Sequence, residues 1–235
     1  MVSPTSRWLD GKRLATINTP RSAKALLEFL NQPSAIGKFY KAHIFIDFWN
    51  LQLSVNSAAT SSYRLDWLKI SPWLITQASN AVGRALSFDG THVYMSYSPN
   101  SKKDAALRDF ATNVLSRFAG VQVSMVERKA QTSPVCPACH QPITSCPHCG
   151  NAIRRTVEKG VDTAIVTDMV KFAWEGALEV AILVSSDRDF IPAVHMLTAK
   201  GFKVINAHFP PTGMNLAGEC WASIDIKKGL PDLSR

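Results

Sequence analysis

Residues 180–190 read VAILVSSDRDF, and this stretch decides the fold class. Its first six residues are apolar or small, which is typical of a β-strand that is buried on both faces. A helical pattern over residues 190–200 and a second apolar run over 203–207 follow it, and a helical pattern over 161–176 precedes it. Short strands that alternate with helices predict a mainly parallel sheet covered by helices on both faces.

The same alternation extends towards the N-terminus. Strands are predicted over residues 42–48 (AHIFIDF), 92–97 and 121–127, with helices over 66–86 and 103–118. Pro72 is expected near a break or in the first turn of its helix, because proline lacks a backbone N–H. The sequence therefore predicts one α/β domain over residues 41–230, a three-layer α/β/α sandwich.

Positive charge is concentrated near the N-terminus. The 235-residue chain has a formal net charge of +8, of which residues 1–41 contribute +5. Residues 1–20 show no periodicity and are expected to form a mobile basic arm, followed over 21–40 by a short amphipathic helix and a linker. Such an arm favours a polyanionic partner such as RNA. A solvated tail that only aids solubility is the alternative.

The composition excludes several protein classes. With 46% hydrophobic and 19% charged residues, the chain is neither disordered nor fibrous. No stretch of about 18 consecutive apolar residues occurs, so no membrane span is expected. The N-terminal residues lack the apolar core of a signal peptide, which favours a cytoplasmic protein.

Four of the five cysteines form two C-x-x-C pairs separated by six residues: Cys136, Cys139, Cys146 and Cys149. Four thiolates at this spacing are typical of a tetrahedral Zn²⁺ site. A closed shell of four sulfurs leaves no position for a substrate, so this zinc is expected to be structural. We predict a zinc-binding insertion over residues 134–151, with a disulfide pair as the alternative.

Acidic residues follow two of the apolar strands. Asp47 ends the first strand, Asp187 and Asp189 follow VAILVSS, and Asp162 opens the helix at 161. Ligands of open parallel sheets bind at the carboxyl ends of the strands, where the strand order reverses. If these strands are neighbours, the four carboxylates converge, and only a hard cation such as Mg²⁺ or Mn²⁺ relieves their repulsion.

Each acid also has a purely structural interpretation. Asp187 or Asp189 is suited to cap the helix near residue 190, and Asp162 to interact with a helix dipole. Asp47 ends a run of large apolar residues, where burial of a charge is costly unless it is compensated. Asp168 lies about 240° around the helix from Asp162, so both are not expected to face one ion.

Three segments together resemble the NYN domain, nearest its LabA-like branch among the PIN-like ribonucleases. They are FIDFWNL (45–51), KGVD (159–162) continuing to TDM (167–169), and AILVSSDRDF (181–190), and the resemblance spans roughly residues 41–226. It implies a PIN-like sandwich and metal-dependent cleavage of RNA. The first forty residues and the cysteine insertion fall outside the pattern, and Ser186 stands where the family usually has glycine.

The resemblance also implies roles for individual residues. Asp47, Asp162, Asp187 and Asp189 match metal-holding acids, Asn50 matches a polar residue that orients Asp47 or substrate, and Lys159 matches a basic residue that meets a phosphate. Arg154, Arg155 and Arg188 are further candidates for phosphate contact, although each alone is equally typical of exposed surface.

Two functions from different classes follow. The first is a Mg²⁺- or Mn²⁺-dependent endoribonuclease that cleaves single-stranded RNA, with a site carboxylate orienting the attacking water. The second is an RNA-binding or scaffold protein without turnover, whose zinc module docks a protein partner. A phosphatase built on the Asp-x-Asp pair is disfavoured, because no acid lies two positions after Asp47.

Overall fold

The computed structural model describes residues 39–99, 101–131, 133–153, 155–157 and 160–235. The expected basic arm over 1–20 and nearly all of the expected helix and linker over 21–40 lie outside this range. Residues 39–235 form one compact unit. No helix in the described part of the chain is long and apolar enough to cross a membrane.

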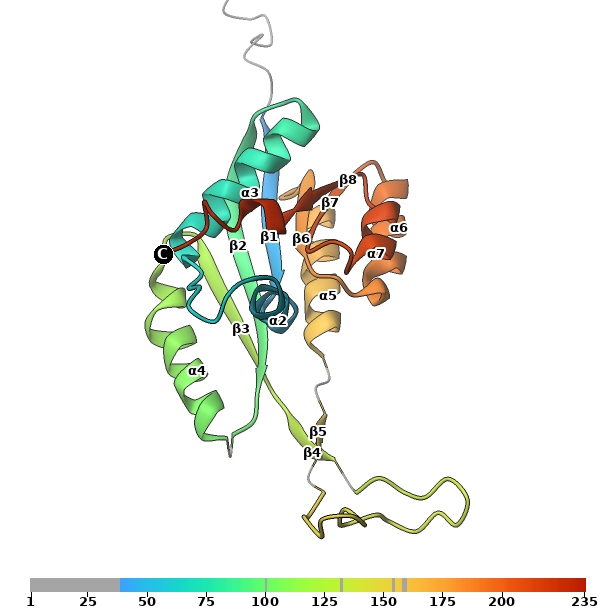
Figure 1. The fold of residues 1–235 in the computed structure, drawn as a ribbon. Helices are drawn as coiled ribbons and strands as arrows, with labels where there is room; N and C mark the ends of the chain where they lie inside the picture. The colour runs from blue at the N-terminus through green and yellow to red at the C-terminus, as the bar shows by residue number, and fades with distance from the viewer. Residues whose placement is uncertain (1–38, 100, 132, 154, 158–159) are drawn as a thin grey trace, which may run out of the picture. The chain divides into compact units, whose positions relative to one another are not determined.

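A six-stranded, wholly parallel sheet lies at the centre of this unit (Figure 1). The strand order is β3-β2-β1-β6-β7-β8, so the chain first builds outward from β1 to β3 and then crosses back to the other side of β1. The strand order therefore reverses between β1 and β6. The bounds are β1 Tyr40–Asp47, β2 Leu86–Tyr97, β3 Val121–Glu127, β6 Val180–Val184, β7 Lys203–His208 and β8 Ala222–Asp225.

Helices cover both faces of the sheet and complete the three-layer α/β/α sandwich. Residues of α2 (Phe48–Ala58), α3 (Trp67–Val82) and α4 (Lys102–Asn113) pack on one face, together with the short C-terminal helix α8 (Ile226–Gly229). Residues of α5 (Val161–Trp174), α6 (Ile191–Ala199) and α7 (Met214–Glu219) pack on the other face.

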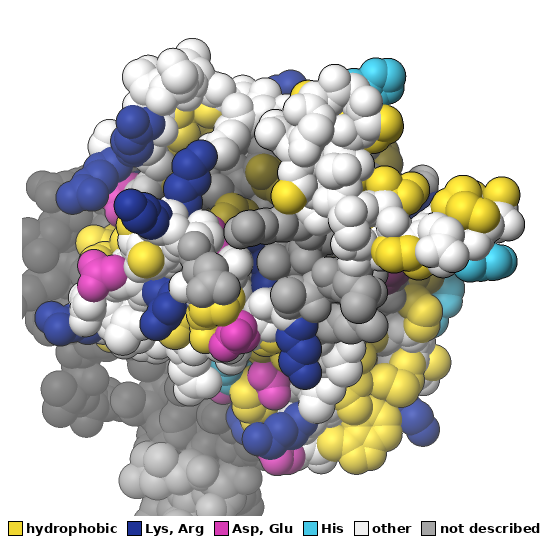
Figure 2. Space-filling model, turned by 90° about the horizontal axis from the view of Figure 1, so that it is seen from below, with side chains coloured by type: hydrophobic (Ala, Val, Ile, Leu, Met, Phe, Trp, Pro, Cys, Tyr) yellow, Lys and Arg dark blue, Asp and Glu magenta, His cyan; other side chains and the backbone are white. Residues whose placement is uncertain are grey.

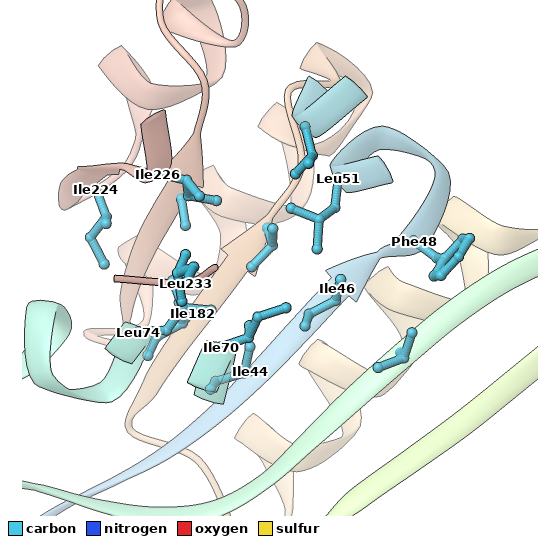
Figure 3. Packing of buried hydrophobic residues seen from close by; sticks show 14 of the residues in the cluster. Ile44, Ile46, Phe48, Leu51, Ile70, Leu74, Ile182, Ile224, Ile226 and Leu233 are labelled. Carbon is cyan, nitrogen blue, oxygen red and sulfur yellow. The ribbon is translucent and has the colours of Figure 1, made fainter. Parts of the chain in front are cut away.

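The strand side chains divide between two hydrophobic clusters with a period of two. Ile44 and Ile46 of β1 belong to the cluster under α2 and α3, whereas Phe45 belongs to the cluster under α5. Figure 3 shows the first cluster, in which Ile44, Ile46 and Ile182 meet side chains from the helices above them. Burial on both faces explains why β1 and β6 are apolar almost without interruption.

Two short antiparallel strands lie outside the main sheet. They are β4 (Lys129–Gln131) and β5 (Arg155–Val157), and they flank the cysteine-containing segment. In Figure 1 they lie beyond the end of β3, and the segment between them extends away from the sheet. The cysteine segment is thus joined to the domain through a two-stranded ladder.

The elements expected from the sequence are present with shifted ends. Helix α3 stops at Val82, because Gly83 adopts a left-handed conformation with φ 68°. Pro72 lies inside this helix rather than at a break. The predicted helix over 103–118 ends at Asn113 and is followed by a 3₁₀ turn, Leu115–Arg117. Helix α2, which begins directly after Asp47, had no counterpart among the expected elements.

Candidate functional site

Asp47 lies where β1 ends and α2 begins, beside the reversal of strand order. Its side chain accepts a hydrogen bond from the backbone amide of Asn50 at 3.1 Å and so caps the helix. Only 9% of the residue is exposed. A buried carboxylate at the carboxyl end of a central parallel strand occupies the place where open α/β sheets bind ligands.

Ser185 connects Asp47 to Asp187. The Ser185 hydroxyl donates to Asp47 Oδ2 at 3.3 Å and accepts a hydrogen bond from the backbone amide of Asp187 at 3.2 Å. Ser185 directly follows β6, which pairs with β1. Because the two strands are neighbours, the expected meeting of the acids that follow them is observed for Asp47 and the Asp187 loop.

Asn50 ties the start of α2 to the same loop. Its side-chain Oδ1 accepts a hydrogen bond from the backbone amide of Ser186 at 2.9 Å. The side chain of Asn50 thus holds the loop after β6, while its backbone amide is held by Asp47. The sequence pattern gave Asn50 an orienting role towards Asp47 or substrate, and the structure places it between Asp47 and the loop.

Asp187 and Asp189 differ in their surroundings. Asp187 Oδ1 accepts from the backbone amide of Asp189 at 2.9 Å and caps the 3₁₀ turn Arg188–Phe190. Asp187 is half-buried and faces a cavity, whereas Asp189 and Arg188 are exposed. Of the two acids considered as caps near residue 190, Asp187 is therefore the one that caps, and it caps the 3₁₀ turn.

Asp162 lies in the first turn of α5 and is exposed. It makes at least one interaction, and its position also suits the positive end of the helix dipole. One and a half turns later, Asp168 accepts a 2.7 Å hydrogen bond from the buried hydroxyl of Tyr94. Burial and this hydrogen bond raise the pKa of Tyr94. Asp168 therefore serves the packing of α5 against β2.

The described residues do not form a ready-made metal centre. No three His, Cys, Asp or Glu side chains among them are grouped so as to hold a metal ion. Of the four acids expected to converge, the described contacts link Asp47 to the loop of Asp187: the Ser185 hydroxyl contacts the Asp47 carboxylate and the backbone amide of Asp187, not its carboxylate. Oxygen-only donors from neighbouring strands nevertheless suit Mg²⁺ or Mn²⁺, since Mg²⁺ is commonly held by one or two carboxylates together with substrate phosphates.

A cavity of about 390 Å³ opens beside these groups. Asn50, Ser186, Asp187 and Arg188 line one side of it, and residues 211–215 line the other. Gly213 has φ 82°, and a Cβ atom there would lie 2.9 Å from Ser186 Oγ. This close approach requires glycine, and it fixes the distance between the two walls of the cavity.

Two buried polar atoms near the site have no hydrogen-bond partner among the described residues. They are Ser186 Oγ, in the cavity wall, and Oδ1 of Asn206 on β7. The nitrogen of the same side chain does have partners, because Asn206 Nδ2 donates hydrogen bonds to the carbonyl oxygens of Leu183 and Ser185. Asn206 therefore fixes the backbone that leads into the site loop. Ser186 was noted from the sequence only as a departure from the glycine usual in the family, and Asn206 was not singled out, since a single Asn within a strand carries no distinctive signal.

Of the four basic residues that the sequence suggested as phosphate contacts, two lie within the described residues. Arg188 is exposed beside Asp187 and lines the cavity. Arg155 begins β5, away from the central sheet. Arg154 and Lys159 lie outside the described residues.

The cysteine segment consists of two successive knuckles with the same backbone pattern. The amide of Cys136 donates to the carbonyl of Gln141, and ten residues later the amide of Cys146 donates to that of Asn151, at 2.9 and 2.8 Å. A bridge closes each knuckle, Val135 to Pro142 and Ser145 to Ala152. Each knuckle thus positions its own pair of cysteines.

The residue after each second cysteine adopts a left-handed conformation. His140 has φ 57° and Gly150 has φ 68°, so each chain turns sharply at the same step. Hydrogen bonds from backbone amides within the knuckles lower the pKa of the Cys136 and Cys146 thiols. All four cysteines are free of disulfides. Within the described chain the two pairs are not gathered into one four-sulfur group.

Comparison with known proteins identifies a family. The model of the NYN domain matches residues 41–226, which is most of the chain. Among solved structures, the chain is similar to a protein of unknown function from Vibrio parahaemolyticus, at 17% sequence identity and a TM-score of 0.45. That similarity covers 80% of this chain and 95% of the other. No curated protein matches the chain.

Proposed function

This chain belongs to the NYN domain family, and we propose that it is a metal-dependent endoribonuclease of the LabA-like branch. NYN domains are part of the PIN-like nuclease superfamily, so a ribonuclease is the class of activity that the family suggests. The observation that supports the proposal most directly is the link from Asp47 through Ser185 to Asp187 at the reversal of strand order.

Asp47 and Asp187 are the residues proposed to hold Mg²⁺ or Mn²⁺. A divalent cation at this place supplies neutralisation of phosphate charge and activation of water. Asp162 and Asp189, which the family pattern also matches to acidic positions, are exposed and are proposed to take a lesser part. Their proposed contribution is smaller than that of the buried Asp47 and the half-buried Asp187, because exposed carboxylates are screened by solvent.

The remaining groups bind and position the RNA. Arg188 lies in the cavity wall next to Asp187 and is placed to contact a phosphate. Asn50 keeps the loop of Ser186 and Asp187 in register with Asp47. The cavity walls at residues 211–215 are proposed to receive the nucleotide next to the scissile phosphate.

Cleavage of labelled single-stranded RNA by the purified protein, with Mn²⁺ or with a chelator, tests this proposal. Asp47→Asn and Asp187→Asn are expected to lower the rate by roughly 100-fold or more, because several kcal/mol of charge stabilisation are lost. Asp225→Asn is the matched control. Asp225 also ends a strand and caps a helix, accepting from the amide of Lys227 at 3.0 Å, but β8 is three places away from β1 in the sheet.

Two results would contradict the proposal. If the aspartate variants cleave as fast as the Asp225 control, the acids do not take part in the reaction. If the wild-type protein binds RNA in a salt-sensitive manner but cleaves none with any divalent metal, the alternative of an RNA-binding or scaffold protein is favoured, with the cysteine module as its candidate site for a protein partner.

We also propose that the cysteine module binds one structural Zn²⁺. The two C-x-x-C pairs have the sequence spacing typical of four-cysteine sites, and the two knuckles share one backbone pattern. Binding one Zn²⁺ requires the two pairs, which are not gathered among the described residues, to come together. Metal analysis of the purified protein is expected to give one zinc per chain, which is lost in Cys139→Ser and Cys149→Ser. Cys220→Ser is the control, because Cys220 lies outside the module and packs against the cluster under α5. Zinc that persists without Cys139 and Cys149 would contradict this assignment.

A further inference from the structure

We propose that Trp49, Tyr97, Arg108 and Arg128 form a binding surface for single-stranded RNA on the β2–β3 side of the carboxylates. We call this surface the arginine–aromatic strip. The inference rests on the proposed function, since it identifies where the RNA lies as it leaves Asp47. None of the basic residues singled out from the sequence belongs to the strip.

The first part of the strip adjoins Asp47. The Arg128 guanidinium lies 5.0 Å from the centre of the Trp49 ring, and both side chains are fixed to Ser96 on β2. Trp49 Nε1 donates to the Ser96 carbonyl at 2.8 Å, and Arg128 Nε donates to the Ser96 hydroxyl at 2.9 Å. Trp49 lies in the first turn of the helix that Asp47 caps, and Ser96 lies two residues beyond Tyr94, the β2 partner of Asp47, so this cation lies at the same edge of the sheet as the proposed site of cleavage.

The second part continues outward along the sheet. Arg108 of α4 stacks on Tyr97 at 4.8 Å from the ring centre. The two parts are connected through the backbone, because the amide of Arg128 donates to the carbonyl of Tyr97 at 2.7 Å. Two arginine–aromatic pairs therefore follow one another at the carboxyl ends of β2 and β3.

Nearby charges favour an anion. Lys102, Lys103 and Lys129 are exposed around the strip, against the exposed carboxylates of Asp109 and Glu127. Figure 2 shows the face onto which the strands end, and Lys and Arg side chains gather on its left side, where α4 lies in Figure 1. Positive charge at this side suits a phosphate backbone that crosses the face.

The cysteine module, by contrast, carries no Lys, Arg, Asp or Glu side chains over residues 133–153. A segment without cations gives little of the phosphate contact that dominates RNA affinity. The strip, rather than the module, is therefore assigned the electrostatic part of RNA binding.

The chemistry of the strip suits unpaired nucleotides. Bases of single-stranded RNA stack on aromatic rings and on guanidinium planes, and guanidinium groups contact phosphates at the same time. The exposed Arg108 has its face against the Tyr97 ring, and the N–H donors lie at the edge of its guanidinium group. Duplex RNA offers no exposed base faces for such stacking.

Stacking of a cation on an aromatic ring does not by itself indicate an RNA-binding surface, because the same arrangement occurs at the opposite end of the sheet. Arg84 lies 4.8 Å from the centre of the Tyr40 ring, at the start of β1. What distinguishes the strip is its place beside Asp47. Arg84→Ala is accordingly a matched control for Arg108→Ala, with the same stacking distance and a different position.

The test is the affinity for a fluorescent single-stranded RNA, measured in the Asp47→Asn background at several salt concentrations. Arg108→Ala and Arg128→Ala are each expected to weaken binding several-fold at low salt and to reduce the slope of log K against log salt by about 0.7. Arg108→Lys is expected to retain the salt slope but not the full affinity, because lysine keeps the charge without the planar group.

Unchanged affinity and slope in Arg108→Ala relative to Arg84→Ala would overturn the inference, as would the absence of measurable RNA binding. Arg108 is exposed, so its removal is not expected to unfold the protein even if Arg128→Ala does. The experiments distinguish failure of the nuclease proposal from failure of the strip proposal. Weakened binding in the strip variants of a protein that never cleaves RNA would support the strip and contradict the nuclease, whereas cleavage that depends on Asp47 with unaffected binding would do the reverse.

Discussion

Asn50 Oδ1 accepts a 2.9 Å hydrogen bond from the backbone amide of Ser186, and this bond joins the first turn of α2 to the loop after β6. The two segments are separated by 136 positions in the sequence. Asp47 lies at the start of one and Asp187 within the other. Their relative position therefore depends on a side chain that is itself not acidic.

Replacing Asn50 with Ala is expected to reduce cleavage without unfolding the protein. The Ser186 amide would lose its acceptor, at a cost of about 1–2 kcal/mol, and the Asp187 loop would be less firmly held. The rate of RNA cleavage and the urea midpoint are the measurements. Asn56→Ala is the control on the same helix, where Asn56 is exposed and accepts a hydrogen bond from the neighbouring Gln52 side chain. Equal cleavage by the two variants would show that Asn50 has no positioning role.

Ser185→Ala is expected to raise the concentration of Mn²⁺ needed for half-maximal cleavage. Ser185 is 1% exposed, and its hydroxyl is the group that joins Asp47 Oδ2 to the Asp187 amide. Its removal leaves both groups without this partner and loosens their mutual arrangement. Ser71→Ala, which removes a hydroxyl bonded to Thr91 elsewhere on the sheet, controls for general loss of stability. A Mn²⁺ dependence that is identical in the two variants would contradict the connecting role.

Gly213→Ala is expected to destabilise the protein by about 1–3 kcal/mol and to lower cleavage. The residue combines a left-handed backbone with a contact of 2.9 Å between the added Cβ and Ser186 Oγ. Gly83→Ala carries the backbone cost alone, because Gly83 has a similar φ of 68° but no described atom within 4 Å of the added Cβ. The difference between the two variants therefore gives the cost of the close contact. The free energies of unfolding of both variants give the comparison. Equal costs would mean that the close contact with Ser186 is unimportant.

The stability of the fold is expected to fall as the pH is lowered from 6.5 towards 4. His43 Nδ1 and His92 Nε2 lie 3.0 Å apart in the interior, and burial together with the neighbouring His43 lowers the pKa of His92 to about 4. Burial likewise lowers the pKa of His43, and the carboxylates of Asp89 and Asp168 oppose these shifts. Between pH 4 and 6.5 the unfolded chain binds more protons than the folded one, so protonation favours unfolding.

The loss attributable to His92 reaches roughly 3 kcal/mol at the acid end of this range. Urea midpoints at pH 7, 6 and 5 measure it. His92→Gln is expected to flatten the decline, while His195→Gln is not, because His195 is exposed and bonded to Glu219. A decline of the same steepness in His92→Gln would assign the acid sensitivity to other groups.

The central sheet could be predicted because burial on both faces leaves a strong signal. Strands such as β6, Val180–Val184, are apolar throughout, and the alternation of strands and helices then restricts the topology. Helix α2 was missed, because Phe48 and Trp49 continue the apolar run of β1. The spacing of Phe48, Leu51 and Val55, all buried, with Asp47 as a cap, is the signal that identifies it.

The site could be predicted only in part, for a similar reason. A carboxylate that ends an apolar strand stands out, and Asp47 and the Asp187 loop do lie on neighbouring strands. Ser185 and Gly213 could not be recognised in this way. Their importance comes from contacts with residues distant in the sequence, and a single Ser or Gly after a strand is common. The convergence of Asp162 was inferred from a pattern that helix-dipole stabilisation produces equally well.

The most direct test of the account is a Mn²⁺-soaked crystal analysed by anomalous diffraction. The account predicts one Mn²⁺ peak in contact with the carboxylates of Asp47 and Asp187, separate from the zinc signal of the cysteine module and absent from a crystal of Asp47→Asn prepared in the same way. An anomalous map with no peak at this pair, or with Mn²⁺ bound elsewhere and both carboxylates engaged by guanidinium groups, would contradict it.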